Sequence, residues 1–447
     1  MASWPATATS ARITKSHSRA MSAALALLVV SVFINYVDRG SLSIAAPLLK
    51  NELGISASRL GILLSAFFWT YTGMLFICGW FVDRFDVNRV LALGFLVWSL
   101  ATAATGVVRG FAMLLIVRMI LGMGESVAFP CYSKILAQHL SEHYRGFANG
   151  AIIAGMKLGP AAGTLGAGLL MTKLGWRPVF LGIGLISLLW LPAWMRWRPR
   201  YEPPSGPPAF CPSARDIFRQ PAFWATAAGG FCVAYPLYFT ITWLPFYLVH
   251  EQHLSMAVMV NKAALFYTID AGAALATGWI TDFWIRRGVG IGAVRKSGMA
   301  LGWMIAAAGF LGCAWAGPHS YLTWLIVTAV GSGIGNSGYW TFTQTLAGPQ
   351  AVGRWGGLKN GFANLGGVIC PALTGFTVDW TGHFHVAIAI TSGVCLLGAM
   401  VWIFLVGELK PVNWARLEEK PRTHRTNTAD PPVDIFTSTA RAKEKLP

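Results

Sequence analysis

Charged residues are scarce in this sequence of 447 residues, where Asp, Glu, Lys and Arg together make up only 12%. That share is about half of what a soluble protein usually carries. Hydrophobic residues make up 55%, and Gly (49) and Trp (20) are plentiful. This composition excludes a disordered chain and argues against a soluble enzyme. Apolar runs of about 20 residues recur along the chain instead, which predicts a polytopic helical membrane protein.

Motifs of metal sites and of enzymes are also lacking. The seven cysteines contain no CxxC pair and no metal-ligand spacing, and six of them lie in or beside apolar runs. We expect them to be small core residues that form neither disulfides nor a metal site. The sequence has no HExxH, no GxSxG and no Cys–His cluster, so we expect no enzyme and no cofactor.

Apolarity and a crossing length of about 20 residues predict twelve spans. Six form a first set, at 24–49, 58–81, 88–107, 111–136, 146–171 and 177–196. Six form a second set, at 223–249, 257–282, 296–315, 320–346, 354–379 and 384–407. The predicted fold class is therefore an all-α polytopic membrane protein with two six-helix halves. Its parts are a tail (1–23), the first half (24–196), a Pro- and Arg-rich linker (197–222), the second half (223–407) and a second tail (408–447).

Basic residues are distributed unevenly between the two sides of these spans. With the N-terminus inside, 25 of the 35 Lys and Arg residues fall on inner segments and five on outer loops. The positive-inside rule then predicts a cell-membrane protein with both termini in the cytoplasm. Because the basic residues behind the net charge of +17 cluster in loops and tails, we expect no nucleic-acid partner. Five basic residues lie within or at the ends of spans: Arg39, Arg118, Lys157, Lys262 and Lys359.

The two halves carry a weak internal repeat. Gly79-Trp80-Phe81-Val82-Asp83 closes the second span, and Gly278-Trp279-Ile280-Thr281-Asp282 closes the eighth. Asn149-Gly150 with Pro160 in the fifth span likewise matches Asn360-Gly361 with Pro371 in the eleventh. Two similar halves around a central path are typical of a transporter.

These segments resemble the major facilitator superfamily. Gly79-x3-Asp83-Arg84 with Arg89 resembles the family's loop between spans 2 and 3, and Gly278-x3-Asp282 with Arg286 and Arg287 resembles its second copy. The resemblance implies that these Asp and Arg residues form a charge latch on the inner face. The chain departs from the pattern at Asp86, where the family usually has Gly, so an altered latch is expected. The alternative interpretation is an ordinary basic loop.

Further motifs resemble one branch of that superfamily, the anion:cation symporters, which includes hexuronate, galactonate, glucarate and sialic-acid transporters. They are Asn35-Tyr36-Val37-Asp38-Arg39, Arg118-x3-Gly122-x-Gly124-Glu125-Ser126-x2-Phe129-Pro130, Trp243-Leu244-Pro245-x-Tyr247-Leu248, and Gln344-Thr345-Leu346-Ala347-Gly348-Pro349 with Gly353-Arg354-Trp355. The resemblance implies a monomeric symporter of sugar acids. It also implies that Tyr36 and Tyr71 belong to the substrate site and that Asp38 is a second protonatable carboxylate.

Ionisable residues stand at the centres of four predicted spans: Asp38 and Arg39, Glu125, Lys157, and Asp270. Placing such a group in lipid costs roughly 2.5–3.5 kcal/mol on insertion scales. We therefore expect them to face a wet or paired interior.

Each central charge has a functional and a structural interpretation. Arg39 offers a planar fork that fits a carboxylate, and it is the predicted substrate ligand. The alternative is a structural arginine paired with Asp38 or Glu125. Glu125 is the predicted proton carrier, because its protonation would free Arg39 for an anionic substrate. Arg118, two turns before Glu125 on the same face, is expected to tune it, or else to serve in helix packing or an outer-gate ion pair.

No histidine stands at a span centre, so proton coupling is expected to depend on Asp38 and Glu125, with a structural helix-to-helix pair as the alternative for Asp38. Lys157 is a second cationic point for substrate or the partner of Asp38 or Asp270. Asp270 is in turn a hydroxyl acceptor or a structural partner. Polar and aromatic candidates at similar depth, each with core packing as its alternative, are Tyr36, Tyr71, Tyr235, Tyr238, Trp340, Asn360 and Asn364.

The sequence thus predicts a proton-coupled transporter of a small organic anion, such as a hexuronate, an aldonate or an aldarate. Its expected partners are that anion, protons and the lipid bilayer. An exchanger or an efflux transporter is the alternative within transport. A nutrient-binding membrane sensor is the alternative from another class.

Overall fold

The computed structural model describes residues 8–139, 142–199, 212–317 and 319–414, and every regular element among them is a helix. These helices belong to one compact unit that ends at Val412. The first set comprises α1 (Ala8–Leu53), α2 (Ala57–Arg84), α3 (Val87–Val107), α4 (Phe111–Ser126), α5 (Ala128–His139), α6 (Glu142–Ala162), η1 (Gly163–Ala167), α7 (Gly168–Leu174), α8 (Trp176–Ser187) and α9 (Trp190–Trp197). After the short α10 (Ala214–Phe218), the second comprises α11 (Pro221–His250), α12 (Met256–Arg286), α13 (Ile291–Ala314), α14 (Tyr321–Asn336), α15 (Tyr339–Thr381), α16 (His385–Met400) and η2 (Val401–Leu405).

Each of the twelve predicted spans lies, apart from a few end residues, within one helix or a run of consecutive helices, and α15 contains both the end of the tenth span and the whole of the eleventh. Ten helical stretches of the described chain are long and apolar enough to cross a membrane by themselves. The other two predicted spans are interrupted, 146–171 by the π-helix η1 and 320–346 by the break between α14 and α15. Helix α15 then continues through a kink at Gly348, whose φ of 67° suits glycine, into the eleventh span.

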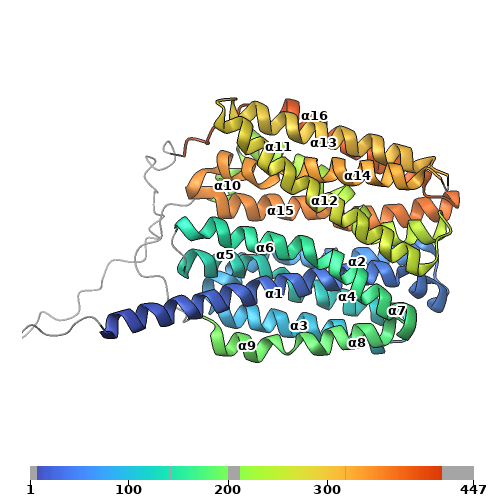
Figure 1. Cartoon of the computed structure of the whole chain (residues 1–447), viewed down its shortest axis with the longest axis horizontal. Coiled ribbons are helices and arrows are strands. Elements are labelled where there is room, and N and C mark those ends of the chain that lie inside the picture. The colour runs from blue at the N-terminus through green and yellow to red at the C-terminus, as the bar shows by residue number, and fades with distance from the viewer. Residues whose placement is uncertain (1–7, 140–141, 200–211, 318, 415–447) are drawn as a thin grey trace, which may run out of the picture. The chain divides into compact units, whose positions relative to one another are not determined.

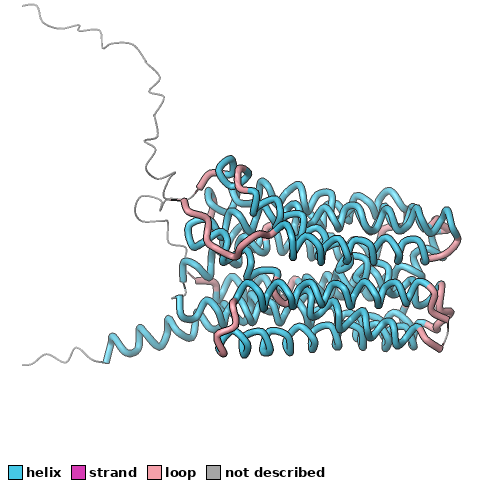
Figure 2. Tube along the Cα trace, turned by 90° about the horizontal axis from the view of Figure 1, so that it is seen from above, coloured by secondary structure: helices cyan, strands magenta, loops and turns pink. Residues whose placement is uncertain are grey.

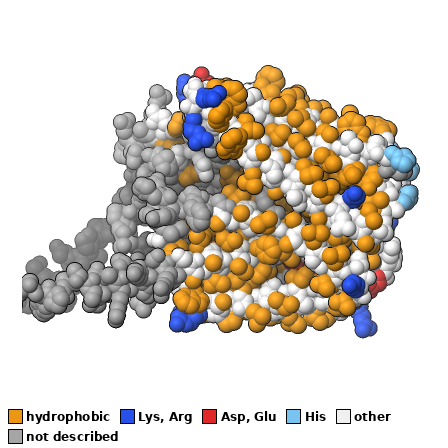
Figure 3. Space-filling view, in the orientation of Figure 1, with side chains coloured by type: hydrophobic (Ala, Val, Ile, Leu, Met, Phe, Trp, Pro, Cys, Tyr) orange, Lys and Arg blue, Asp and Glu red, His pale blue; other side chains and the backbone are white. Residues whose placement is uncertain are grey.

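The helices run side by side along the long axis of the unit, with α1 projecting beyond the others at its N-terminal end (Figures 1 and 2). We call the end where α1 begins the tail end and the opposite end the far end. Hydrophobic side chains cover most of the face in Figure 3, with basic residues and histidines gathered at its margins. Exposed apolar side chains such as Leu275 and Trp380 extend this surface. Such an exterior suits a hydrocarbon environment, in which helices satisfy their own backbone groups.

Small residues let the helices of the first half approach closely. A Cβ atom on Gly122 of α4 would lie 2.2 Å from the carbonyl oxygen of Phe67 in α2. A Cβ atom on Gly159 of α6 would lie 2.5 Å from Cβ of Tyr36 in α1. Close packing of small residues is the usual way in which membrane helices associate. Here it brings α4 against α2, and α6 against the part of α1 that carries Asp38 and Arg39.

The cysteines are buried, as predicted, at each of the six positions that the structure describes. They are Cys78, Cys131, Cys232, Cys313, Cys370 and Cys395, while Cys211 lies outside the described residues.

At the far end, α15 of the second half closes on α2 of the first half. The carboxylate of Asp379 accepts hydrogen bonds from the backbone N–H groups of Ala57 (2.8 Å) and Ser58 (2.7 Å). These are free donors of the first turn of α2, and the helix dipole favours a negative charge there. The ammonium of Lys50 in α1 also lies 5.2 Å from the ring centroid of Phe246 in α11. Charge therefore joins the two halves at this end.

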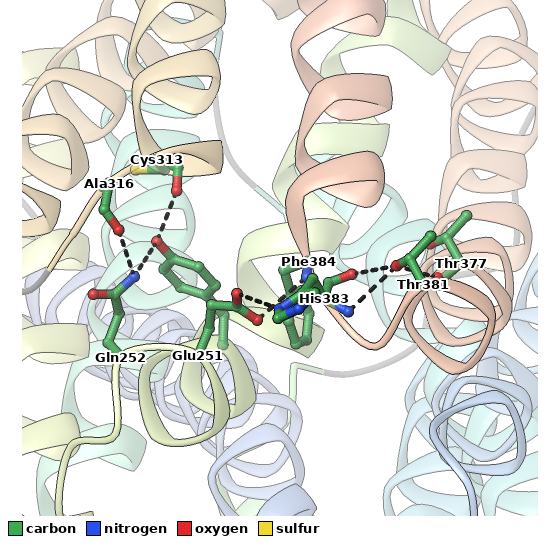
Figure 4. Close-up of polar contacts among 9 residues, drawn as sticks. Glu251, Gln252, Cys313, Ala316, Thr377, Thr381, His383 and Phe384 are labelled. Carbon is green, nitrogen blue, oxygen red and sulfur yellow. Dashed lines mark hydrogen bonds and ion pairs between the residues drawn. The ribbon is translucent and has the colours of Figure 1, made fainter.

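A second polar network stiffens the far end within the second half (Figure 4). Glu251, just after α11, has its Oε1 3.1 Å from Nδ1 of His383 and accepts a hydrogen bond from the N–H of Phe384 (3.3 Å). The neighbouring Gln252 donates to the hydroxyl of Tyr247 (3.0 Å) and to the carbonyl of Ala316 (3.3 Å). These bonds tie the end of α11 to the turn before α16 and to the end of α13.

Candidate functional site

A buried ion pair joins α1 to α4. Nε of Arg39 donates a hydrogen bond to Oε2 of Glu125 (2.9 Å), and Nη2 of Arg39 lies 2.8 Å from the same oxygen. The two side chains are 7% and 0% exposed. Oε1 of Glu125 accepts no hydrogen bond from any described group. The carboxylate of Glu125 thus contacts Arg39 through one oxygen, and its other oxygen has no hydrogen-bond partner among the described groups.

Aromatic rings surround the guanidinium of Arg39. Its carbon lies 4.9 Å from the ring centroid of Tyr36, 4.8 Å from that of Phe67 and 4.8 Å from that of Tyr71. Each such contact is worth about 0.5–2 kcal/mol, with the higher values in dry surroundings. The rings hold the arginine in place without neutralising it. Only Glu125 contributes an opposite charge in direct contact among the described residues.

Asp38 and Arg118 form a second pair of buried charges beside the first. Oδ2 of Asp38 accepts a hydrogen bond from the hydroxyl of Thr102 in α3 (2.7 Å), whereas its Oδ1 has no partner among the described groups. Arg118 acts electrostatically on both Asp38 and Glu125. Its Nε and Nη2 make no hydrogen bond with described groups. We call Asp38, Arg39, Arg118 and Glu125 the central charge cluster, which contains two acids and two bases.

The cluster borders aromatic and amide side chains of the second half. Phe68 of α2 packs against Tyr238 of α11, with ring centroids 4.3 Å apart. The hydroxyl of Tyr238 donates to Oδ1 of Asn364 (2.5 Å), and Nδ2 of Asn364 donates to the carbonyl of Asn360 (2.7 Å). Tyr238 also lies within electrostatic range of Arg39. The structure therefore brings Tyr36, Tyr71, Tyr238 and Asn364 to the neighbourhood of Arg39.

Other predicted site residues lie elsewhere or outside the described side chains. Tyr235 is buried, at a point where α15 approaches the backbone of α11 closely through Gly366. Trp340 is 41% exposed and belongs to the part of α15 before the kink. Asp270 is buried on α12. The side chain of Lys157 is outside the described part of the structure.

The predicted latch residues are only partly described. The side chains of Asp83 and Asp282 lie outside the described part, and those of Arg84, Arg286 and Arg287 are exposed. Nε of Arg89 lies 3.5 Å from Oδ2 of Asp86, and Nη1 of Arg198 lies 3.7 Å from the same oxygen. Asp86 also caps α3 by accepting the N–H of Asn88 (2.9 Å). Asp86, which stands where the family usually has Gly, is thus the described residue that contacts Arg89.

Sequence reasoning counted Lys359 among the basic residues of the spans but gave it no role. Its side chain is 0% exposed, and Nζ donates to the hydroxyl of Thr343 (2.5 Å) and to the carbonyl of Tyr339 (3.3 Å). Nζ lies 3.5 Å from the ring centroid of Tyr339 and 4.9 Å from that of Trp340. No carboxylate among the described side chains pairs with it. The sequence feature that indicates this site is a lysine within the predicted span 354–379, away from the centre of that span.

Comparison with known proteins gives the family. The profile described as Major Facilitator Superfamily matches residues 28–294 and 290–437. The D-galactonate transporter of Escherichia coli O6:H1 (strain CFT073) is 29% identical over 422 residues, which cover 87% of this chain and 96% of that protein. The hexuronate transporter of Bacillus subtilis (strain 168) is 28% identical over 394 residues, which cover 85% of this chain and 93% of that protein.

A solved structure has the same fold. A bacterial homologue of the human lysosomal transporter Spinster, crystallised in an inward-facing and occupied conformation, superposes with a TM-score of 0.71 at 17% identity. The match covers 85% of this chain and 96% of that one. It supports the predicted all-helical fold.

Proposed function

The chain belongs to the Major Facilitator Superfamily and is a multi-pass membrane transporter rather than an enzyme, and from that premise we propose that it is a proton-coupled symporter of a small organic anion. The proposed substrate is a sugar acid, since relatives along nearly the whole chain are D-galactonate and hexuronate transporters. The observation that carries the proposal is the buried Arg39–Glu125 pair, in which a carboxylate of the protein occupies the side chain best suited to bind a carboxylate of the substrate.

Coupling follows from competition for Arg39. While Glu125 is ionised, it engages Nε and Nη2 of Arg39 and neutralises the charge of the guanidinium, so an anion gains little from binding there. When a proton binds Glu125, the acid becomes neutral and the substrate carboxylate replaces it on Arg39. Substrate and proton then neutralise the site together. Loss of the proton on the other side of the membrane restores the pair and expels the anion.

Asp38 and Arg118 have supporting parts in this mechanism. The open Oδ1 of Asp38 is available to a second proton, and Arg118 opposes that protonation through its charge. Arg118 also acts on Glu125, so the two acids share one electrostatic environment. Tyr36, Tyr71, Asn364, Trp340 and Lys157 are the proposed contacts for the rest of the substrate, with Asp270 and Asn360 as further polar contacts.

Uptake into proteoliposomes tests this proposal. Purified protein is reconstituted, and entry of radiolabelled D-galactonate or D-glucuronate is followed with a pH gradient as the only driving force. Concentrative uptake that a protonophore abolishes supports symport. Substrate exchange at a rate that does not depend on the pH gradient supports an exchanger instead. Binding without transport supports a sensor.

Transport requires alternating access, and we propose that the two halves rock about the central charge cluster. Their boundaries follow the predicted parts, 24–196 and 223–407, joined by the linker 197–222. The tail end is assigned to the cytoplasm from the basic residues there, and the cell membrane is the proposed location of a monomer. With Asp379 on the N-terminus of α2, the structure then corresponds to a state closed toward the outside.

The predicted inner latch is tested by the Asp83→Asn variant. If Asp83 and Asp282, with Arg84, Arg89 and Arg286, close the tail end in the outward-open state, loss of the Asp83 charge favours the inward-open state. The reporter is a single cysteine replacing Thr72, in a background without native cysteines; Thr72 is one helical turn from Phe68 and from Phe76, which lie against Gly367 and Gly361 of α15. We expect faster maleimide labelling in the variant. An unchanged labelling rate contradicts the latch and does not bear on the proposal for the central charge cluster.

The closure at the far end is tested by the Asp379→Ala variant. Each lost hydrogen bond to the carboxylate is worth about 1.5–3 kcal/mol. Net loss of one such bond raises the open population roughly tenfold or more. A single cysteine replacing Ser65, on the same face of α2 but nearer the far end, is expected to react faster with maleimide in the purified protein.

Asp216→Ala is the matched control, because the carboxylate of Asp216 accepts the backbone N–H of Ser213 in the capping box of the short α10 instead. An equal labelling rate in Asp379→Ala and in this control contradicts the closing role of Asp379.

A further inference from the structure

Lys359 is a buried lysine whose amino group contacts only neutral groups among the described residues. A hydroxyl and a carbonyl accept its hydrogen bonds, and the rings of Tyr339 and Trp340 lie against it. Arg39, by contrast, has Glu125, and Arg118 has Asp38 in electrostatic range. Hydrogen bonds and ring contacts orient an ammonium without neutralising it. A buried charge without a protein counter-ion is therefore suited to an anion that is not part of the chain.

Two tyrosines connect this lysine to the central charge cluster. Lys359 stands five residues before Asn364 on α15, about 7.5 Å nearer the tail end at 1.5 Å per residue. Tyr339, whose ring lies against the ammonium, is within electrostatic range of Tyr238, and Tyr238 is within range of Arg39. Arg39 and Lys359, from different halves, thus border the same run of tyrosines.

The hydroxyl of Tyr339 provides an independent observation. It is buried and makes no hydrogen bond with any described group. A buried hydroxyl without a partner is costly, and a polar ligand between the two cations would supply one.

We propose that Lys359 is the second anion-binding point of the substrate site and that the preferred substrates are dianions, organic acids with an ionised group at each end. One carboxylate binds the fork of Arg39 and the other binds the ammonium of Lys359. Hydroxyl groups between them meet Tyr238, Tyr339 and Asn364. The flexible four-carbon stem of lysine lets its ammonium turn from Thr343 toward the substrate when the halves move. This inference rests on the proposed function and narrows its substrate class.

A matched pair of probes tests the inference. D-Glucarate and D-gluconate share one carbon skeleton and differ in that only D-glucarate has a carboxylate at both ends. Calorimetry on the purified full-length protein is expected to show D-glucarate binding at least roughly tenfold more tightly, the effect of one more charge-assisted contact. In Lys359→Met the Kd for D-glucarate rises to that for D-gluconate, while the Kd for D-gluconate stays within about twofold of wild type, because the contact to Arg39 remains.

Two further variants complete the test. Lys262→Met, the same change at a half-buried lysine on α12, leaves the preference intact. Lys359→Arg keeps the charge and retains a preference for D-glucarate. Equal affinities of the wild type for the two acids, or an equal loss of both in Lys359→Met, overturn the inference. If Lys359→Met does not fold, the ratio of the wild-type Kd values for D-glucarate and D-gluconate decides whether the inference stands. Failure to bind either acid overturns the proposed function as well, whereas equal binding overturns only this inference.

Discussion

Replacing Arg39 by lysine is expected to abolish most uptake of a sugar acid. Lysine keeps the charge but loses the planar fork that meets a carboxylate, and the three rings around the guanidinium leave a compact ammonium without comparable contacts. Loss of one charge-assisted hydrogen bond costs about 1.5–3 kcal/mol. The expected result is a decrease in apparent affinity from roughly tenfold to over a hundredfold, measured as initial uptake rates in proteoliposomes.

Arg59→Lys is the matched control, since Arg59 is exposed near the start of α2 and the same substitution there removes no buried fork. We expect it to transport like the wild type. Wild-type affinity and transport in Arg39→Lys would remove Arg39 from the substrate site and favour the structural interpretation, in which the arginine only pairs with Glu125.

Replacing Glu125 by glutamine is expected to separate exchange from accumulation. Glutamine resembles the protonated acid, so Arg39 stays available to the substrate and exchange across the membrane continues. Each proton moved down a gradient of one pH unit supplies about 1.4 kcal/mol, enough for roughly tenfold accumulation. The wild type is expected to approach that ratio, and the variant is expected to equilibrate its substrate without concentrating it.

Glu408→Gln is a suitable control because this glutamate is exposed and pairs with Lys410 outside the cluster. It is expected to accumulate substrate normally. If Glu125→Gln still concentrates substrate with the pH gradient as the only driving force, then Glu125 is not the essential proton site and Asp38 becomes the first candidate.

The span positions and the depths of the central charges followed from sequence, because both depend on local composition. Apolar runs predict the helices, and an ionisable group at the centre of such a run is costly enough to mark a polar interior. The family match confirms the fold class that the motifs predicted.

The sequence left Arg39 with two possible partners, Asp38 and Glu125, and the structure selects Glu125. Glu125 meets Arg39 because Gly122 lets α4 approach α2 near α1, and helix packing of this kind leaves no pairing signal in the sequence. Asp379 was missed since its partners are backbone N–H groups, which every residue but proline carries. Lys359 lies away from the centre of its span, so its place in the sequence indicates no role, and its burial among neutral groups is a feature of the fold.

The most direct test of the account is the number of protons taken up when the substrate binds. Calorimetry with D-galactonate or D-glucarate, repeated in buffers of different ionisation enthalpy, measures this number on the purified protein without transport. The account predicts net proton uptake by the wild type and a clear decrease in Glu125→Gln, because the substrate replaces Glu125 on Arg39 only after that acid is neutral. Binding without proton uptake in the wild type, or with the same uptake in both proteins, would contradict it.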